Sequence, residues 1–335
     1  MKIRKEYILL VAVILSLSAY IFLRKPDRTH YQLPKLSEIA VKNITKIEIK
    51  GPDGTVILKK KDRSWNIDPK GYPADAAMIK NMLDIADKLT ITALVSESKN
   101  YERYDLNDEM KITVKALAGN TPVRTFEVGK AAGSYRHTFI KLAGDDRVYH
   151  ARGNFRGKFD KTVDELRDKT VLSFDQKQIQ EIHITKDDQV VAFTCKDVPV
   201  KTVPEKKKNV EGSSPASKTN KVWQTADGKK VDGSKLKNLI RTLSKLRCDN
   251  YIEGKKKDGF SNPIYSVRLK GAKEYFLSIF NKTAKGAKGH PAISSENIYP
   301  FFLSDWKAKD IMKTPEELLE KKKPDKMAKS VAPIY

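Results

Sequence analysis

The residues that could carry out chemistry occur in this sequence as incomplete sets. Ser134 lies three positions before His137, and these residue types serve as nucleophile and base in serine hydrolases. A triad also needs a third group that orients the imidazole, and no spacing in the chain nominates one. A serine and a histidine lie this close by chance in most chains, so a hydrolase is not predicted.

Two potential sets of metal ligands are also incomplete. His137 and His150 could face each other across a hairpin, but two histidines without a carboxylate make a poor metal site. Adjacent aspartates occur at 145–146 and 187–188, both at predicted hairpin turns, where Asp is favoured because it hydrogen-bonds the local backbone. We interpret the aspartates as turn residues and predict no metal and no cofactor.

Other motifs of catalysis are missing. The chain has no glycine-rich nucleotide loop, no His-Glu-x-x-His and no Gly-x-Ser-x-Gly. Its two cysteines, Cys195 and Cys248, lie outside any Cys-x-x-Cys motif, so they could form one disulfide in an exported protein or stay buried thiols. The sequence thus predicts a protein that is not an enzyme and has no catalytic, cofactor-binding or metal-binding residues.

The charge balance is strongly basic. The formal net charge is +23, from 65 Lys and Arg against 42 Asp and Glu, which favours contact with anionic lipid or an acidic envelope polymer. The alternative is that the lysines are simply solvated, because they are spread along the whole chain. Nucleic acid is not expected as a partner, because signatures that interleave aromatic and basic residues are missing. The predicted polyanion contacts are Lys206, Lys207, Lys208, Lys255, Lys256 and Lys257.

The elements that must position these residues look like two copies of one unit, residues 44–175 and 179–320. The copies open with similar strands, at 44–49 and 179–184, and a tryptophan follows in each, Trp65 and Trp223. An aspartate then lies ten positions after Trp65 and nine after Trp223, and each opens a helical pattern. Equivalent placement predicts that both tryptophans pack in a core.

Each copy is predicted to be α+β and mostly antiparallel. Short alternating stretches such as 111–116 predict strands, and turns too tight for crossovers join them. Apolar stripes at 78–89 and 236–246 predict one amphipathic helix per copy. The predicted fold is therefore two tandem sheet-plus-helix units behind one amino-terminal transmembrane helix.

The predicted domain boundaries follow from this pattern. The first repeat spans 41–175 and the second 176–320, and the second carries a Lys-, Pro- and Ser-rich mobile insertion at about 199–221. Residues 321–335 are predicted to be a disordered tail. Arg167 and Asp168 are predicted to join the end of the first repeat to the start of the second.

The amino terminus has the pattern of a membrane anchor. Basic residues precede an uncharged apolar run at 7–23, which as a helix would be roughly 25 Å long. A cleaved signal peptide is the alternative, because a small-x-small site lies at 16–18, but the apolar run continues beyond it. We predict a cytoplasmic tail at 1–6, a retained anchor at 7–23 and a tether at 24–40, with the body exported.

The chain resembles the family called domain of unknown function 4340. The resemblance rests on Trp-x-Ile at 65–67, an Ala-Asp helix start at 74–75, Gly-Phe-Ser-Asn-Pro at 259–263, and Leu-Arg-Asp-Lys at 166–169. Where the second copy has Gly259 the first has Asp105, which also tolerates left-handed backbone. The resemblance implies one membrane segment, a periplasmic body and a gene encoded near those of ABC-type transport components, and it supplies no catalytic residues.

These observations predict a non-enzymatic, membrane-tethered binding or scaffold protein of the bacterial inner membrane, single-pass, with its body in the periplasm and transporter subunits as partners. Two alternatives stay open. One is a cell-envelope enzyme that acts on polysaccharide or peptidoglycan, and the other is a basic polyanion-binding protein that faces the cytoplasm.

Overall fold

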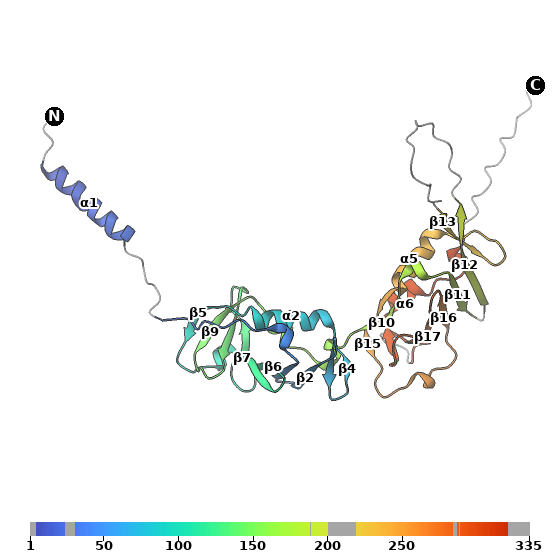
Figure 1. Ribbon diagram of the computed structural model, residues 1–335, viewed down its shortest axis with the longest axis horizontal. Coiled ribbons are helices and arrows are strands. Elements are labelled where there is room, and N and C mark those ends of the chain that lie inside the picture. The colour runs from blue at the N-terminus through green and yellow to red at the C-terminus, as the bar shows by residue number, and fades with distance from the viewer. Residues whose placement is uncertain are drawn as a thin grey trace, which may run out of the picture. The chain divides into compact units, whose positions relative to one another are not determined.

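The structure is a computed structural model that describes residues 5–23, 31–187, 189–199, 219–283, 287 and 289–320. The chain separates into two compact units, Met1–Arg167 and Asp168–Tyr335 (Figure 1). Lys206, Lys207 and Lys208, the predicted tail at 321–335 and most of the predicted insertion lie outside the described residues.

The first element is helix α1, Lys5–Leu23, which contains the whole predicted anchor segment. None of the described helices has the length and apolar character needed to span a membrane. The transmembrane assignment of residues 7–23 therefore stays a prediction.

The first unit is built on one antiparallel sheet whose nine described strands run in the order β4-β3-β2-β1-β6-β7-β8-β9-β5. Helix α2, Ala76–Asp87, and the short helices α3, Arg156–Phe159, and α4, Val163–Leu166, complete the unit. The strands are β1 Lys46–Gly51, β2 Gly54–Lys61, β3 Ser64–Asp68, β4 Tyr72–Pro73, β5 Ile91–Ser96, β6 Ile112–Ala118, β7 Thr121–Ala131, β8 His137–Leu142 and β9 Val148–Arg152.

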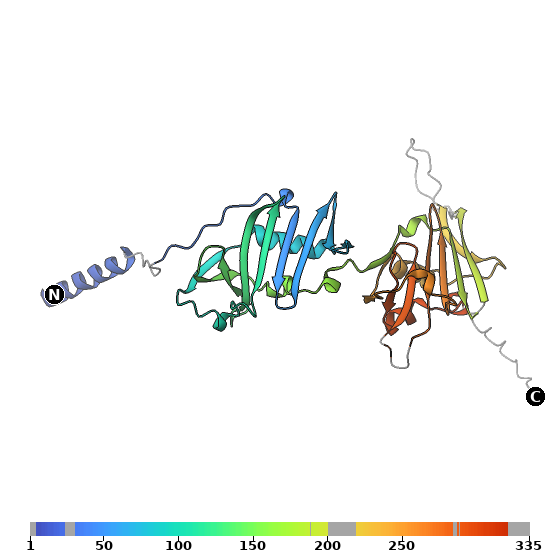
Figure 2. The same cartoon turned by 90° about the horizontal axis from the view of Figure 1, so that it is seen from below.

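Side-chain alternation gives this sheet two different faces. Ile47 and Ile49 of β1 are buried beside their partners Ala116 and Val114 of β6, which forms the inner face. Helix α2 covers this face with its own buried stripe, so the predicted period-two and helical patterns are both confirmed. In Figure 2 the strands of this unit lie in front of α2.

Residues 31–43 form an ordered strap that runs to the end of α2. Arg124, a buried residue of β7, donates from Nη2 to the carbonyl oxygen of Ser37 at 2.5 Å and from Nε to that of Ala86 at 3.1 Å. The backbone N–H of Ile39 also donates to Asp87 Oδ1 at 3.4 Å. Burial lowers the pKa of Arg124. The described part of the predicted tether is thus bound to the unit.

The second unit repeats this architecture. Its described strands form a sheet of order β13-β12-β11-β16-β17-β18-β19-β15, and β10 pairs separately with β14. Helices α5, Gly233–Leu243, and α6, Asp305–Ile311, belong to this unit. Its strands are β10 Thr170–Ser173, β11 Glu181–Lys186, β12 Gln189–Pro199, β13 Thr219–Thr225, β14 Lys245–Arg247, β15 Asn250–Tyr251, β16 Tyr265–Lys270, β17 Glu274–Ile279, β18 His290–Ser294 and β19 Phe301–Leu303.

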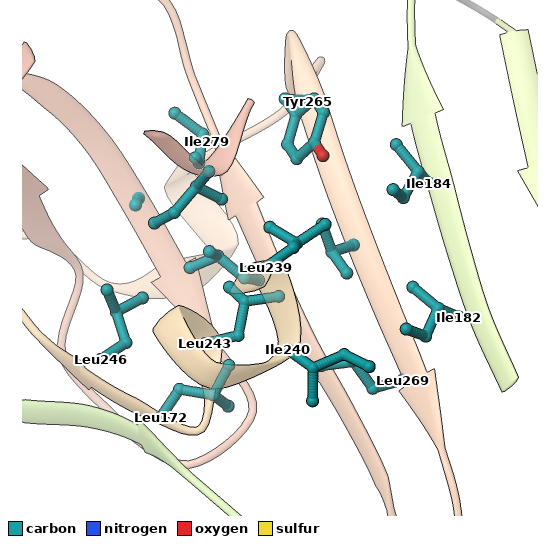
Figure 3. Packing of buried hydrophobic residues seen from close by; sticks show 14 of the residues in the cluster. Leu172, Ile182, Ile184, Leu239, Ile240, Leu243, Leu246, Tyr265, Leu269 and Ile279 are labelled. Atoms are coloured by element: carbon teal, nitrogen blue, oxygen red, sulfur yellow. The ribbon is translucent and has the colours of Figure 1, made fainter. Parts of the chain in front are cut away.

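The core of the second unit lies between α5 and its sheet. Leu239, Ile240 and Leu243 of α5 point toward apolar residues of β11, β16 and β17 (Figure 3). Trp223 is partly buried against this cluster, and Cys248 lies inside it. Burying each large aliphatic side chain contributes about 2 kcal/mol, so this interface accounts for much of the unit's stability.

In both units, a leucine near the carboxyl-terminal end of the described segment bonds the helix cap in the same way. The backbone N–H of the helix cap Asp75 donates to the carbonyl oxygen of Leu166 at 2.8 Å, and that of Asp232 donates to Leu318 at 2.8 Å. A threonine–glutamate capping pair precedes each leucine, at 162–165 and at 314–317. This agreement extends the correspondence between the units beyond the strand order.

Three local details differ from the sequence predictions. Helix α5 ends at Leu243, so Leu246 lies on β14, because β14 pairs with β10 instead of extending the helix. Strands β12 and β13 extend into both ends of the predicted insertion. Asp105 has φ 54°, whereas in the corresponding turn at 259–263 of the second unit it is Asn262, with φ 59°, and not Gly259 that is left-handed.

The predicted helix cap at Asp75 is confirmed, and Asp232 caps α5 in the same manner. One carboxylate oxygen of each accepts two backbone N–H bonds of its helix, at 3.0 and 3.2 Å for Asp75 and at 3.2 Å for both at Asp232. We expect Asp75→Ala and Asp232→Ala each to lower the unfolding free energy by about 1 kcal/mol, measured by urea denaturation. Asp75→Asn, which keeps an acceptor, should lose less, and equal losses for Asn and Ala would contradict the capping role.

Candidate functional site

The outer face of the first sheet, opposite α2, carries a row of polar residues across five strands. The register places Thr55, Lys50, Thr113, Glu127 and Lys141 side by side on β2, β1, β6, β7 and β8. They lie on this face because they alternate with the buried residues that contact the core. We refer to this row and its neighbours as the outer face.

Glu127 lies between Thr113 and Lys141 in the row and is bound by two lysines. Lys111 Nζ lies 2.9 Å from Glu127 Oε1, and Lys141 Nζ lies 3.3 Å from Oε2. Lys111 also lies 2.6 Å from Asp108, and this bond raises the pKa of Lys111 and lowers that of Asp108. Opposite charges on adjacent strands stabilise the sheet by roughly 0.2–1 kcal/mol per pair.

The segment that follows β5 covers one end of the outer face. Tyr104 and Leu106 are buried against Val148, and Tyr101 and Phe139 pack beside them. Lys141 also makes a cation–π contact with the Tyr101 ring, with its Nζ 4.1 Å from the ring centroid. This second, smaller apolar cluster fixes the boundary of the charged surface.

The remainder of the outer face is open and forms a hollow of about 390 Å³. Lys50 and Lys115 line it together with Glu48 and Thr113. Within the described ranges, neither Lys50 nor Lys115 has an ion-pair partner, whereas Glu48 pairs with Lys46. The hollow can therefore accept a carboxylate or another anion. The row of lysine and glutamate beside it carries both positive and negative charges.

The predicted turn at 145–146 is an ion-paired loop. Arg147 donates to both carboxylate oxygens of Asp145, at 3.0 and 2.9 Å, and the Tyr149 hydroxyl donates to Oδ2 at 2.7 Å. These bonds hold the pKa of Asp145 well below its usual range. Burial, together with the bond to Asp145, raises the pKa of Tyr149 to about 12. Asp146 pairs with Lys99 instead, at 2.6 Å. Both carboxylates are therefore engaged in structural bonds.

His137 and His150 do meet on adjacent strands, β8 and β9. Their rings stack with centroids 5.3 Å apart, and Phe139 packs on His150 at 4.8 Å. Among the residues that the structure describes, no group of three or more His, Cys, Asp or Glu could hold a metal ion. Ser134 Oγ accepts a bond from the backbone N–H of Arg136 at 3.4 Å.

His150 gives the first unit a dependence on pH. Burial, and then the charge of His137, lowers the pKa of His150, so the folded state favours its neutral form. Its stabilising contribution is complete above the unfolded pKa of about 6.5 and is lost as the pH falls through the lower folded pKa.

We expect the unfolding free energy of the wild type to fall between pH 7.5 and pH 5.5, measured by urea denaturation, and His150→Gln to reduce this fall. His183→Gln, which removes an imidazole from the second unit, serves as the control. An unchanged pH response in His150→Gln would contradict the assignment.

Three of the predicted polyanion contacts are described, and they differ from one another. Lys255 and Lys256 are exposed, and Lys255 lies 5.9 Å from the Phe260 ring centroid. Lys257 is half-buried, donates to the carbonyl oxygen of Ser294, and has a pKa lowered by burial. Only Lys255 and Lys256 of this group therefore present their charge openly.

Arg167 and Asp168 lie in different units. Arg167 is buried, with its guanidinium 3.7 Å from the Tyr72 ring centroid in the first unit. Asp168 accepts the backbone N–H of Thr170 at 2.9 Å, and its carbonyl oxygen accepts the Tyr251 hydroxyl at 2.6 Å, both in the second unit.

The outer-face residues were not among the predicted site residues. The alternation at 111–116 predicts which side chains leave the core, but it does not tell which strands lie next to one another. Glu127 and Lys111 are brought together only by the pairing of β6 with β7. The site therefore depends on the order of strands in the sheet.

Comparison with known proteins gives one result. No curated protein and no solved structure matches the chain. The model of the family described as Domain of unknown function (DUF4340) matches residues 65–263, which is more than half of the 335 residues. The match starts at Trp65 and ends at Pro263, two of the positions on which the resemblance rests. The chain therefore belongs to the DUF4340 family.

Proposed function

We propose that this protein is a non-enzymatic scaffold of the bacterial inner membrane. In this proposal α1 is a retained single-pass anchor, the body lies in the periplasm, and the outer face of the first sheet binds a subunit of an envelope transport complex of the ABC type. The observation that carries the proposal is the open outer face, where a lysine–glutamate row borders a hollow with two exposed lysines.

The chemistry of this surface supports a protein partner. Lys50 and Lys115 can pair with acidic side chains, and Glu127 with its two lysines is already neutralised and provides a fixed border. Charges of both signs on a rigid sheet select a partner by electrostatic complementarity and speed its association. The lining of the hollow consists of lysine, threonine, glutamate, aspartate and glycine, which suits polar contacts with the surface of another protein.

The membrane tether is supported by the sequence of α1. Residues 7–23 carry no charge, and basic residues precede them. A phosphatase reporter fused after Tyr335 should be active if the body is exported. An inactive phosphatase fusion together with a fluorescent cytoplasmic fusion would place the body on the other side and reject this part of the proposal.

The proposed partner is tested by co-purification. The intact protein is isolated from detergent-solubilised membranes together with the proteins that are bound to it. We expect the wild type to recover transporter subunits and the double variant Lys50→Glu, Lys115→Glu to lose them. The matched control is Lys80→Glu, Lys237→Glu, which changes the charge equally at exposed positions on α2 and α5. Recovery of the same subunits by both double variants, or of no transporter subunit by the wild type, would reject the proposed surface.

A further inference from the structure

A second hollow, of about 380 Å³, lies on the other side of the first unit, between α2 and α3. Ile85, Leu89 and Phe155 provide its apolar lining, and the last two are buried. Three cations, Lys88, Arg152 and Lys158, also line it. We refer to it as the α2–α3 groove.

The charges of the α2–α3 groove are not neutralised by the fold. Among the described residues, Lys88, Arg152 and Lys158 have no ion-pair partner, and Asp84 is the one carboxylate in the lining. The groove therefore carries an excess of two positive charges beside apolar side chains. This combination suits an anion attached to an apolar group, because the guanidinium and ammonium groups bind phosphate oxygens while the lining buries carbon.

The second unit supplies an internal comparison. A hollow of about 400 Å³ lies beside α5, and Asn238 lines it six residues after the cap Asp232, as Asn81 lines the α2–α3 groove six residues after Asp75. Its lysines have carboxylates close by: Lys235 lies 3.3 Å from Asp232, and Lys313 lies 3.9 Å from Asp310.

One of the differences between the linings of the two hollows falls at an aligned position. Lys158 and Asp310 each lie four residues before the threonine of the closing capping pair, Thr162 and Thr314. The first unit has a lysine where the second has an aspartate. The net positive charge is therefore a property of the first groove and not of the shared fold.

We propose that the α2–α3 groove binds the phosphate headgroup of an anionic phospholipid. The choice of a lipid rests on the proposed membrane tether. Ser37, where Arg124 holds the strap, is fourteen residues after the end of α1, so the unit can lie at most about 50 Å from that end. The strap also bonds Asp87, the neighbour of Lys88, so the groove lies at the end of α2 where the tether attaches.

The proposal is tested by isothermal titration calorimetry, in which dihexanoyl phosphatidylglycerol is added to the full chain in nonionic detergent. This short-chain lipid reaches the groove whether or not α1 spans a membrane, so a failed anchor does not decide the outcome. We expect saturable binding, no binding of dihexanoyl phosphatidylcholine, and weaker binding of inorganic phosphate. Lys158→Asp, which installs the residue of the second unit, should weaken binding by about tenfold.

Lys309→Asp is the matched control, because Lys309 is an exposed lysine on α6 and its charge changes equally. It should change the affinity by less than about twofold. Arg152→Gln should weaken binding as Lys158→Asp does, and thermal unfolding of each variant verifies that it folds. Equal weakening by Lys309→Asp, equal binding of phosphatidylcholine, or phosphate binding as tight as that of the lipid would each overturn the assignment.

Discussion

Gly129→Ala is expected to destabilise the first unit by about 3 kcal/mol, although it adds one methyl group. An ideal Cβ at this position would overlap the carbonyl oxygen of Tyr104 and lie 2.9 Å from Leu106 Cγ. Neither neighbour can move freely, because the Tyr104 oxygen is backbone and Leu106 is buried. The segment at 101–106 must therefore lift away from β7 and uncover the apolar cluster at this end of the outer face.

Hydrogen–deuterium exchange read by mass spectrometry measures this local loss, and urea denaturation measures the global one. We expect peptides that cover 101–106 to exchange faster in Gly129→Ala than in the wild type. Gly133→Ala is the control, because a Cβ there meets nothing within 4 Å. Similar exchange in the two variants would show that the close approach of Tyr104 to β7 contributes little.

Leu166→Ala and Leu318→Ala form the second pair of large effects. Both leucines are fully buried, and each carries the carbonyl oxygen that accepts the N–H of a helix cap. Truncation leaves a cavity at a position that the backbone hydrogen bond to the helix cap holds in place, so each variant should lose about 3 kcal/mol of unfolding free energy. The loss should appear in the first unit for Leu166→Ala and in the second for Leu318→Ala.

The controls for this pair come from exposed positions in the same units. Val163 on the helix of Leu166 is 37% exposed, and Ile298 in the second unit is 74% exposed. Their alanine variants should lose less than about 1 kcal/mol. Exchange mass spectrometry assigns each loss to its unit. A large loss for one leucine and none for the other would mean that the two closures, although they have the same hydrogen bonds, are not energetically equivalent.

Much of the fold could be predicted from local patterns. The hairpin of β1 and β2, the cap at Asp75 and the helical stripes at 78–89 and 236–246 each depend on residues close together in the chain. The duplication in the sequence also predicts that these elements follow one another in the same order in both units. The end of α5 was harder to predict, because Leu246 continues the apolar spacing of the helix but pairs as a strand with β10, about seventy residues earlier.

The candidate sites depend on contacts that no local pattern contains. Lys88 directly follows α2, Arg152 ends β9 and Lys158 lies on α3, and the sequence gives no reason to group them. A basic cluster in the sequence does not by itself indicate an open charged surface, because a lysine such as Lys257 bonds a carbonyl oxygen of its own unit. The arrangement of charge on a folded surface depends on which strands pair and where helices cross them.

The strap also decides where a mechanical load enters the first unit. A force applied to the chain before Ser37 reaches the two hydrogen bonds of Arg124 and then the last turn of α2, instead of peeling β1 from its neighbours. Because β1 lies between β2 and β6 in the interior of the sheet, this route protects the strand that organises the unit. Arg124 thus transfers a force on the amino-terminal segment to the end of α2 before that force reaches β1.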